Sequence, residues 1–190
     1  MGDRKQPTFP MIVVISGTNR PDSNTRKIAG VAADMVVAAG QQATILDLCD
    51  LPPELFSPAS YNTTPEGFAP FQHAMSAADG VLCVVPEYNG SFPGALKYFI
   101  DMLAFPQSLV GTIAAFIGIS SGPWGGVRAV EQLEMVFQYR HAHLYGRRVF
   151  LPAVAQMLDE NGRLAEPAAE RRLREMVTDF VRHCTHLSTL

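Results

Sequence analysis

The sequence predicts an α/β fold in which a parallel β-sheet lies between two layers of helices. Short apolar runs rich in β-branched residues alternate along the chain with longer segments of helical spacing; such runs are typical of strands that are buried on both faces. This alternation gives right-handed crossovers, which place helices on both sides of the sheet. With 190 residues, 47% of them hydrophobic, the chain is long enough for one domain with a substantial core.

The expected strands are five apolar segments. The first covers residues 11–15, reads Met-Ile-Val-Val-Ile and ends at Ser16-Gly17. Four more follow in order, and the fifth has the shortest apolar run. They cover residues 43–48, 81–85, 112–117 and 149–151.

Three helical segments carry apolar residues at i, i+3, i+4 and i+7, which indicates one face packed on a core. Ser23 or Asn24 can cap the first, and Gly40 can end it. Pro167 introduces the last and suits a first helical turn. The apolar positions are Ile28, Val31, Ala32, Met35, Val36 and Ala39; Val127, Val130, Leu133 and Phe137; and Leu173, Met176, Val177, Phe180, Val181 and Cys184.

One domain is expected at residues 11–190, after a flexible tail at residues 1–10 that is polar and lacks the apolar core of a signal peptide. A net charge of -3 leaves no basic excess for nucleic acid. No apolar run approaches the roughly 20 residues of a membrane span. Cys49, Cys83 and Cys184 are far apart and form no CxxC pair, which fits a reducing, cytoplasmic compartment.

Ligands of doubly wound sheets bind at the carboxyl ends of the strands, where the strand order reverses. The loops after the first, third and fourth strands are therefore the expected site. The proline-rich segment at residues 51–65 leaves the second strand at the same edge. It either covers the site or is a surface excursion, and the sequence leaves both open.

The first loop, residues 16–25, offers hydroxyl, amide and guanidinium groups directly before a helix N-terminus. Free backbone N–H groups and the helix dipole favour a phosphate there, although a plain capped turn would use the same residues. The dinucleotide fingerprint does not fit, because Gly17 is the loop's only glycine and Asp47 lies about 30 residues on instead of about 20. The Gly-Lys-Ser/Thr ending of a Walker loop is missing.

The second loop, residues 86–94, has two prolines and two glycines. They give a stiff backbone that can approach the polar edge of a flat ring. The third loop, residues 120–126, again lets main chain come close to a ligand. Each loop alone is also compatible with an ordinary turn, and Trp124 either stacks on a ligand or shields the sheet edge.

Together, these motifs resemble the NADPH-dependent FMN reductase family, which includes quinone, chromate and azo-dye reductases. The resemblance runs from about residue 11 to about residue 180, and Pro86-Glu87-Tyr88-Asn89 is its most specific part. The first loop and Ser91 also match. The other matching segments are Leu46-Asp47-Leu48, Asp50-Leu51-Pro52, Pro93-Gly94-Ala95-Leu96-Lys97, Ile100-Asp101 and Gly125-Gly126 with Arg128.

The resemblance implies a flavodoxin-like three-layer sandwich with five parallel strands in the order 2-1-3-4-5. It implies FMN as cofactor, NADPH or NADH as hydride donor, and a free flavin, quinone, azo compound or metal oxyanion as acceptor. If protein covers one face of the ring, nicotinamide and acceptor must use the other face in turn, which predicts a ping-pong reaction. The matching cofactor positions are Thr18, Arg20, Ser23, Asn24 and Thr25 for the phosphate; Pro86, Glu87, Tyr88, Asn89 and Gly90 along the isoalloxazine; and Ser120, Gly122, Trp124 and Gly125 on the ring's other side.

No catalytic acid or base is assigned, because a flavin carries the chemistry of hydride transfer and the protein supplies position and electrostatics. Two alternatives are a flavodoxin-type electron carrier and a non-enzymatic flavin-binding module. Carriers usually bear more negative charge than -3, and their ring loops are aromatic.

Apolar residues on more than one face of two helical segments predict a homodimer or a dimer of dimers. The bulky pair Tyr98-Phe99 and the large Trp124 depart from the family pattern, which puts subunit packing and acceptor size in question. The apolar residues that predict the dimer are Leu96, Tyr98, Phe99, Met102 and Leu103 on one helical segment and Met135 and Val136 on the other.

No metal site is expected. His141 and His143 have no cysteine or carboxylate cluster nearby in the sequence and are interpreted as exposed residues in a turn. His183 and His186 flank Cys184 on the last helix, where core packing and a frayed end explain them. Cys83 lies inside the third strand and is expected to be inert.

Overall fold

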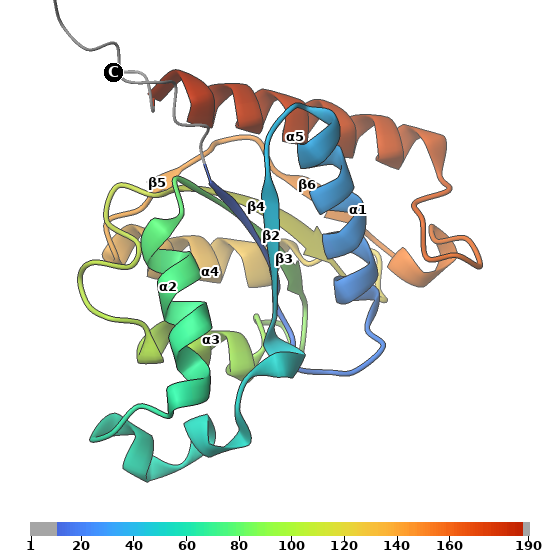
Figure 1. The fold of residues 1–190 in the computed structure, drawn as a ribbon. Helices are drawn as coiled ribbons and strands as arrows, with labels where there is room; N and C mark the ends of the chain where they lie inside the picture. Colours follow the sequence, from blue (N-terminus) through green and yellow to red (C-terminus); the bar gives the residue numbers. More distant parts are fainter. Residues whose placement is uncertain (1–10, 188–190) are drawn as a thin grey trace, which may run out of the picture.

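The computed structural model describes residues 11–187, which form a parallel sheet with helices on both faces (Figure 1). The tail expected at residues 1–10 lies outside the described residues. The strands are β1 (Ile12–Ser16), β2 (Ala43–Asp47), β3 (Gly80–Pro86), β4 (Ile113–Ile119), β5 (His143–Leu144) and β6 (Val149–Leu151). The helices are α1 (Asn24–Ala38), α2 (Ala69–Ala77), α3 (Gly94–Met102), α4 (Val127–Tyr139) and α5 (Pro167–Leu187).

The strand order is β2-β1-β3-β4-β5 and every pair is parallel, so the predicted 2-1-3-4-5 order is confirmed. Ile12 of β1 lies opposite Ala43 of β2 on one side and opposite Gly80 of β3 on the other. The chain therefore adds strands in opposite directions from β1. The loops that leave β1 and β3 diverge at this point and open a crevice at the carboxyl edge of the sheet.

The outer edge of β4 is covered by two short strands. The strand predicted at residues 149–151 is β6, which pairs with β4 at residues 117–119, and β5 pairs with the beginning of β4. The prediction that His143 lies in a turn is wrong. The His143 N–H donates to the Thr112 carbonyl at 2.9 Å, and the Tyr145 N–H donates to the Ala114 carbonyl at 2.8 Å. A strand forms here because this pairing satisfies backbone groups that the edge of β4 would otherwise expose.

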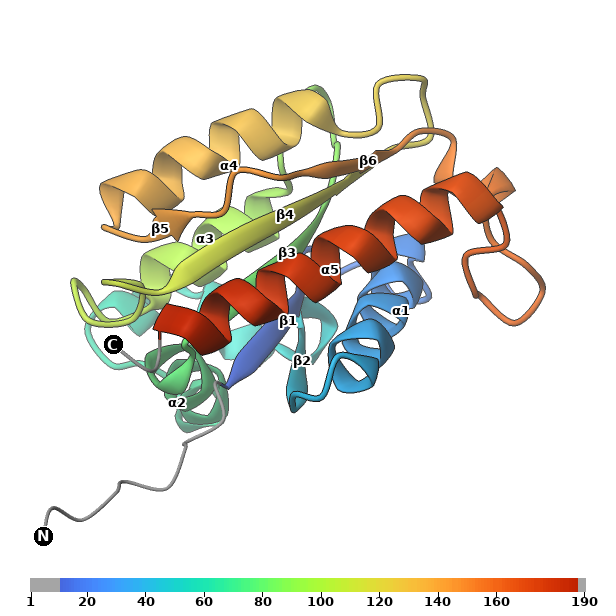
Figure 2. The ribbon, with the colours of Figure 1, turned by 90° about the horizontal axis from the view of Figure 1, so that it is seen from above.

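Two cores lie on the two faces of the sheet. One is built with α1 and α5 and includes Ile28, Met176 and Phe180. The other is built with α2, α3 and α4 and includes Phe99 and Phe137. Figure 2 shows α1 and α5 on one side of the strands and α3 and α4 on the other. Both faces of the central strands are thus buried, which explains their continuous apolar sequences.

The sequence pattern assigned three residues of the α3 region to an outer surface, and this was wrong. Leu96, Phe99 and Leu103 are 0%, 0% and 3% exposed within the chain itself. Phe99 packs edge-on against Phe68 and Phe71 from the segment before α3. Helical spacing alone could not locate these partners, because they come from another part of the chain.

The proline-rich segment packs on α3. It forms two 3-10 helices, Pro53–Phe56 and Pro58–Tyr61. The rings of Phe56 and Tyr61 lie 5.1 and 6.0 Å from the ring of Tyr98, which accounts for a bulky residue at that position. No residue of this segment lines the cavity described below, which favours a surface excursion.

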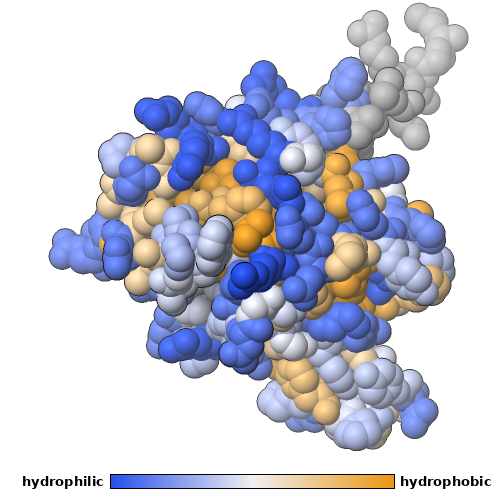
Figure 3. Space-filling view, turned by 180° about the vertical axis from the view of Figure 1, so that it is seen from behind, coloured by the Kyte–Doolittle hydropathy of each residue, from blue (hydrophilic) through white to orange (hydrophobic). Residues whose placement is uncertain are grey.

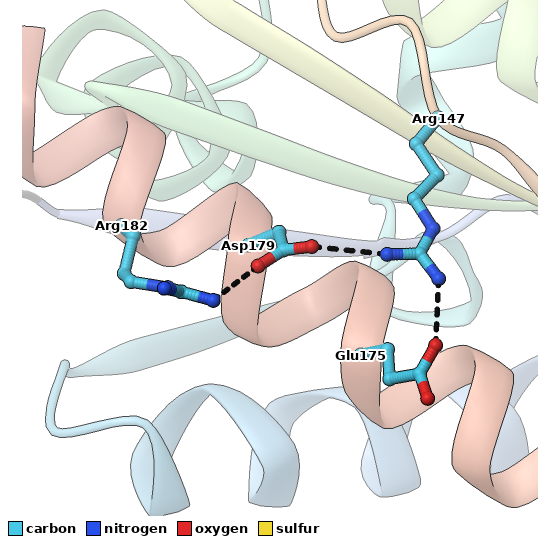
Figure 4. Close-up of polar contacts among 4 residues, drawn as sticks. All are labelled: Arg147, Glu175, Asp179 and Arg182. Atoms are coloured by element: carbon cyan, nitrogen blue, oxygen red, sulfur yellow. Dashed lines mark hydrogen bonds and ion pairs between the residues drawn. The ribbon is translucent and has the colours of Figure 1, made fainter.

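Surface ion pairs connect helix α5 to Arg147 (Figure 4). Arg147, between β5 and β6, lies 2.8 Å from Glu175 and 2.9 Å from Asp179, which also pairs with Arg182. Exposed ion pairs contribute about 0–1 kcal/mol each, so packing of the apolar face supplies most of the stability of α5. No helix in the described part of the chain is long and apolar enough to cross a membrane.

Candidate functional site

A cavity of about 390 Å³ opens at the carboxyl ends of β1, β3 and β4. Its size falls within the range of about 300–1,000 Å³ that small-molecule and cofactor sites occupy. All three loops selected from the sequence contribute to its wall. The lining residues are Arg20, Pro21, Asp22, Ser23, Asn24, Thr25, Pro86, Glu87, Tyr88, Ile119, Ser120, Ser121 and Val154.

One end of the cavity is the N-terminus of α1. Ser23 caps this helix, because its hydroxyl accepts the Arg26 N–H at 3.2 Å. The amides of the first helical turn have no acceptor within the helix, so those of Asn24 and Thr25 are available to a ligand. Arg20 lines the same end, is exposed and pairs with no side chain in the part of the chain that the structure describes. This end is therefore suited to an anion.

Thr18 lies behind the cavity wall. It is fully buried, and its hydroxyl lies 2.9 Å from the Tyr88 hydroxyl and accepts the Arg20 N–H at 3.2 Å. Its polar atom is thus engaged within the protein. Thr18 thus links the loop after β1 to the loop after β3, and its hydrogen bond to the Arg20 N–H fixes the backbone position of Arg20.

The loop after β3 is rigid. Tyr88 and Ser91 exchange two backbone hydrogen bonds of 2.8 and 3.1 Å across Asn89 and Gly90, whose φ angles are 53° and 79°. This is the geometry of a two-residue primed turn. Gln132 of α4 accepts the Ser91 hydroxyl at 2.7 Å and donates to the Gly90 carbonyl at 3.1 Å. Residues 86–88 line the cavity, whereas Asn89 and Gly90 only shape the turn.

The loop after β4 reaches the cavity at its beginning. Ser120 and Ser121 line the wall, but Gly122, Trp124 and Gly125 do not. Trp124 is 65% exposed. Gly125 is packed against β6, because a Cβ there would lie 2.9 Å from the Phe150 Cβ. Gly125 thus has a packing role that the sequence did not indicate.

Five lining residues were not predicted. Pro21, Asp22 and Ser121 lie inside the selected loops, and Ile119 ends β4. Val154 follows β6, and its N–H donates to the Ser120 carbonyl at 3.0 Å. Val154 had no signal in the sequence, because only the return of the chain beside β4 brings it to the site.

Three non-glycine residues around the cavity have left-handed backbone conformations. The φ angles of Asp22, Asn89 and Ala153 are 51°, 53° and 45°. Asp and Asn adopt this region more readily than other residues because their side chains can hydrogen-bond locally, whereas Ala has no such compensation. Backbone strain of this kind gathers at functional sites, where the surrounding structure holds it in place.

The charged lining of the cavity is mixed. Arg20 is its one cation, and Asp22 and Glu87 are its two acids, among the residues that the structure describes. Glu87 is fixed at its backbone, because its N–H donates to the Ile119 carbonyl at 3.0 Å. Its Oε2 atom is buried and has no hydrogen-bond partner among the described residues. A ligand with an anionic end therefore fits the part of the cavity that Arg20 and the N-terminus of α1 line.

Comparison with known proteins identifies the family. A model of NADPH-dependent FMN reductases matches residues 10–156. The chain belongs to the NADPH-dependent FMN reductase family. A 2-hydroxy-1,4-benzoquinone reductase of a Burkholderia species is 29% identical over 173 residues, which cover 89% of this chain and 93% of the relative. An NAD(P)H-dependent FMN reductase of Pseudomonas aeruginosa is 28% identical over 173 residues, which cover 87% and 90% of the two chains.

Solved structures show the same fold. The flavoenzyme FerB, an NAD(P)H:(acceptor) oxidoreductase from Paracoccus denitrificans, superposes with a TM-score of 0.76 at 22% identity, over 92% of this chain and 98% of that one. An archaeal flavodoxin gives 0.62 at 12% identity over 93% and 99%. The fold is therefore flavodoxin-like. Membership of this family makes the protein an NAD(P)H-dependent FMN/quinone reductase-like oxidoreductase, which disfavours the electron-carrier alternative.

The remaining candidate residues lie outside the cavity. His141 and His143 are exposed, and the part of the chain that the structure describes contains no group of three or more His, Cys, Asp or Glu residues that could hold a metal ion. Burial raises the pKa of the Cys83 thiol, and it raises that of Cys184 to about 12. Both thiols are therefore protonated at neutral pH.

Proposed function

We propose that this protein binds FMN in the cavity at the carboxyl edge of the sheet and passes hydride from NADPH through it to a small acceptor. One observation carries the proposal. A helix N-terminus with a free arginine and the rigid loop after β3 line the same cavity of about 390 Å³. FMN has a phosphate for the first and a flat polar ring for the second.

Each group of residues has a distinct part in this proposal. Arg20 and the Ser23, Asn24 and Thr25 positions hold the phosphate. Pro86, Glu87 and Tyr88 border the isoalloxazine, with Ser120 on the other side. Thr18, Asn89, Gly90, Gly122 and Gly125 act indirectly, by fixing the loops that carry these contacts.

Bound FMN supplies a group that accepts hydride and passes electrons on. The chain's own residues bind it, orient it and leave part of it open to small molecules. No side chain is assigned as a catalytic acid or base. If protein covers one face of the ring, nicotinamide and acceptor must use the other face in turn, which is the basis of a ping-pong reaction.

Anaerobic addition of NADPH to the FMN-loaded protein is expected to bleach the flavin absorbance fully, with two electrons taken up per FMN. Steady-state lines at several fixed concentrations of a quinone are expected to be parallel, because oxidised nicotinamide leaves before the quinone enters. Unchanged absorbance would reject the proposed reaction. Intersecting lines would reject the shared face.

The role of Trp124 can be tested in the same assay. We place this residue beside the open face, so Trp124→Ala should change the KM for a bulky quinone more than the KM for NADPH. Tyr61→Ala is a matched control, because Trp124 and Tyr61 are 65% and 67% exposed and Tyr61 does not line the cavity. Equal changes in the two variants would remove Trp124 from the acceptor site.

We also propose that the protein is a homodimer or a dimer of dimers. Hydrophobic residues gather in separate patches between hydrophilic ones on the face shown in Figure 3. A groove of about 420 Å³ between α3 and α4 is lined by both apolar and charged residues. Phe105, Met135 and Tyr139 in this lining are 59%, 62% and 74% exposed. Lys97, Asp101 and Arg140 are its charged members. Burying such a surface in an interface stabilises an oligomer.

Met135→Lys is expected to shift the oligomer toward monomer, because it would bury a charge among the exposed apolar side chains of this groove. Light scattering at micromolar concentration measures the change. Val37→Lys on α1 is the control, since Val37 is 59% exposed and lies outside the groove. A monomeric mass for the unmodified protein would contradict the proposal.

Cys49 and Cys83 form no disulfide among the described residues. Free thiols persist in reducing compartments, and we therefore propose a cytoplasmic location.

A further inference from the structure

Gln132 belongs to two surface features at once. Its amide nitrogen donates to the Gly90 carbonyl at 3.1 Å, and its amide oxygen accepts the Ser91 hydroxyl at 2.7 Å, so it supports the turn after β3. The same side chain lines the groove between α3 and α4. It begins a stripe on α4 that continues through Met135 and Tyr139, at the i, i+3 and i+7 spacing of one helical face. Whatever covers the groove therefore also covers the side chain that supports the turn.

The turn depends on this support. Asn89 and Gly90 have φ angles of 53° and 79°, and a left-handed conformation is unfavourable for a residue with a Cβ. Among residues 11–187, Gln132 is the one side chain outside the turn that hydrogen-bonds to residues 89–91. The residues directly before the turn, 86–88, form part of the cavity wall. Order in the turn and order in that wall are thus linked.

The groove has the composition of a surface that pairs with its own copy. A two-fold interface brings identical patches together, so each patch must be complementary to itself. Lys97 and Asp101 supply opposite charges one helical turn apart, with side chains 46% and 39% exposed, and Phe105, Met135 and Tyr139 supply exposed apolar surface. A partner of a single charge sign would leave one of these two charges unmatched. A second copy offers a base for Asp101 and an acid for Lys97.

We propose that a second copy of this chain occupies the groove, and that its docking and the binding of FMN strengthen each other through Gln132. This inference rests on the proposed function and on the proposed dimer. In the free chain, water in the groove competes for the half-buried Gln132 amide. Docking excludes that water, and hydrogen bonds are stronger in less polar surroundings. The turn and the adjoining cavity wall are then ordered before the cofactor arrives, which lowers the cost of binding it.

Such coupling acts equally in both directions, because a partner that raises the affinity for FMN is itself bound more tightly when FMN is present. The first measurement is the dimer dissociation constant, obtained by light scattering over a dilution series with and without saturating FMN. We expect FMN to lower this constant by about fivefold or more. The second measurement is the FMN affinity of Met135→Lys, whose altered residue lines the groove and not the cavity. This affinity should fall by a similar factor wherever only the variant is monomeric.

Gln132→Met removes both hydrogen bonds and keeps a side chain of similar length in the groove. The ratio of its dimer dissociation constants without and with FMN should fall to nearly one, whatever the absolute stability of its dimer. Ser91→Ala should also lower this ratio, because it breaks one of the bonds from a residue that lines neither groove nor cavity. Gln138→Met is the control, since Gln138 is an exposed residue of α4 outside the groove. Its ratio should equal that of the unmodified protein.

The same dimer dissociation constant with and without FMN would overturn the coupling, as would a full ratio in Gln132→Met or a lost ratio in Gln138→Met. Unchanged FMN affinity in monomeric Met135→Lys would overturn it too, even for a dimer too tight to dissociate on dilution. A protein that binds FMN as a monomer, or a dimer that Met135→Lys does not weaken, would show that the groove receives something other than a second copy, while leaving the proposed function intact. Failure to bind FMN would instead overturn the proposed function, and the coupling with it.

Discussion

Replacement of Arg20 by alanine is expected to weaken FMN binding by tenfold or more. A charge-assisted hydrogen bond to phosphate contributes about 1.5–3 kcal/mol, and about 1.4 kcal/mol corresponds to tenfold in affinity. Arg20 lines the anion-suited end of the cavity, and its side chain forms no hydrogen bond or ion pair with other described residues. Its removal therefore breaks no internal ion pair, and a change in affinity reports on the ligand contact.

Two comparisons make the Arg20 experiment specific. Riboflavin lacks the phosphate, so its affinity should be nearly the same for the unmodified protein and for Arg20→Ala. Arg171→Ala removes an exposed arginine of α5 that does not line the cavity, and it should leave the FMN affinity unchanged. If fluorescence titration gives the same FMN affinity for folded Arg20→Ala, the first loop does not hold the phosphate through this side chain.

Gly126→Ala is expected to lower the free energy of unfolding by about 2–5 kcal/mol. Gly126 has a φ of 83°, and this conformation costs a residue with a Cβ about 1–2 kcal/mol. The added Cβ would also lie 2.8 Å from the backbone N and O of Ile119. Overpacking of this kind costs about 1–3 kcal/mol. Because Ile119 lines the cavity, FMN binding should weaken as well.

The matched control lies in the same loop. A Cβ added at Gly122 would enter open space, with no atom of a more distant residue within 4 Å. Gly122→Ala is therefore expected to change stability by less than about 0.5 kcal/mol. Urea unfolding of both variants, with midpoints and slopes compared, measures the difference. Equal stability of Gly126→Ala and Gly122→Ala would show that the close approach of Gly126 to β4 is relaxed in solution.

The fold was predictable because its signals are local. The long central strands are continuous apolar runs, as at residues 81–85, and α1, α4 and α5 each carry an apolar stripe at helical spacing. Short-range rules also located the start of α1, since Ser23 caps it. The position of the cavity followed from topology, because parallel strands place the loops after β1, β3 and β4 at one edge.

Only the tertiary structure decided which residues of those loops face the cavity. Thr18 and Asn89 have the polar groups expected of ligands, yet one is engaged with Tyr88 and the other forms a turn. Val154 reaches the wall from a segment more than thirty residues beyond Ser120 in the chain. These outcomes depend on contacts between distant parts of the chain.

The sequence by itself determined the alternation of the main strands and helices, the edge of the sheet at which the cavity opens and, through the family motifs, the class of chemistry. The tertiary structure decided that Leu96 and Phe99 are buried and that Glu87 is left without a partner among the described residues. The physical reason is that periodicity and capping act within a few residues, whereas burial and hydrogen-bond satisfaction are set by whichever distant segment packs against a side chain.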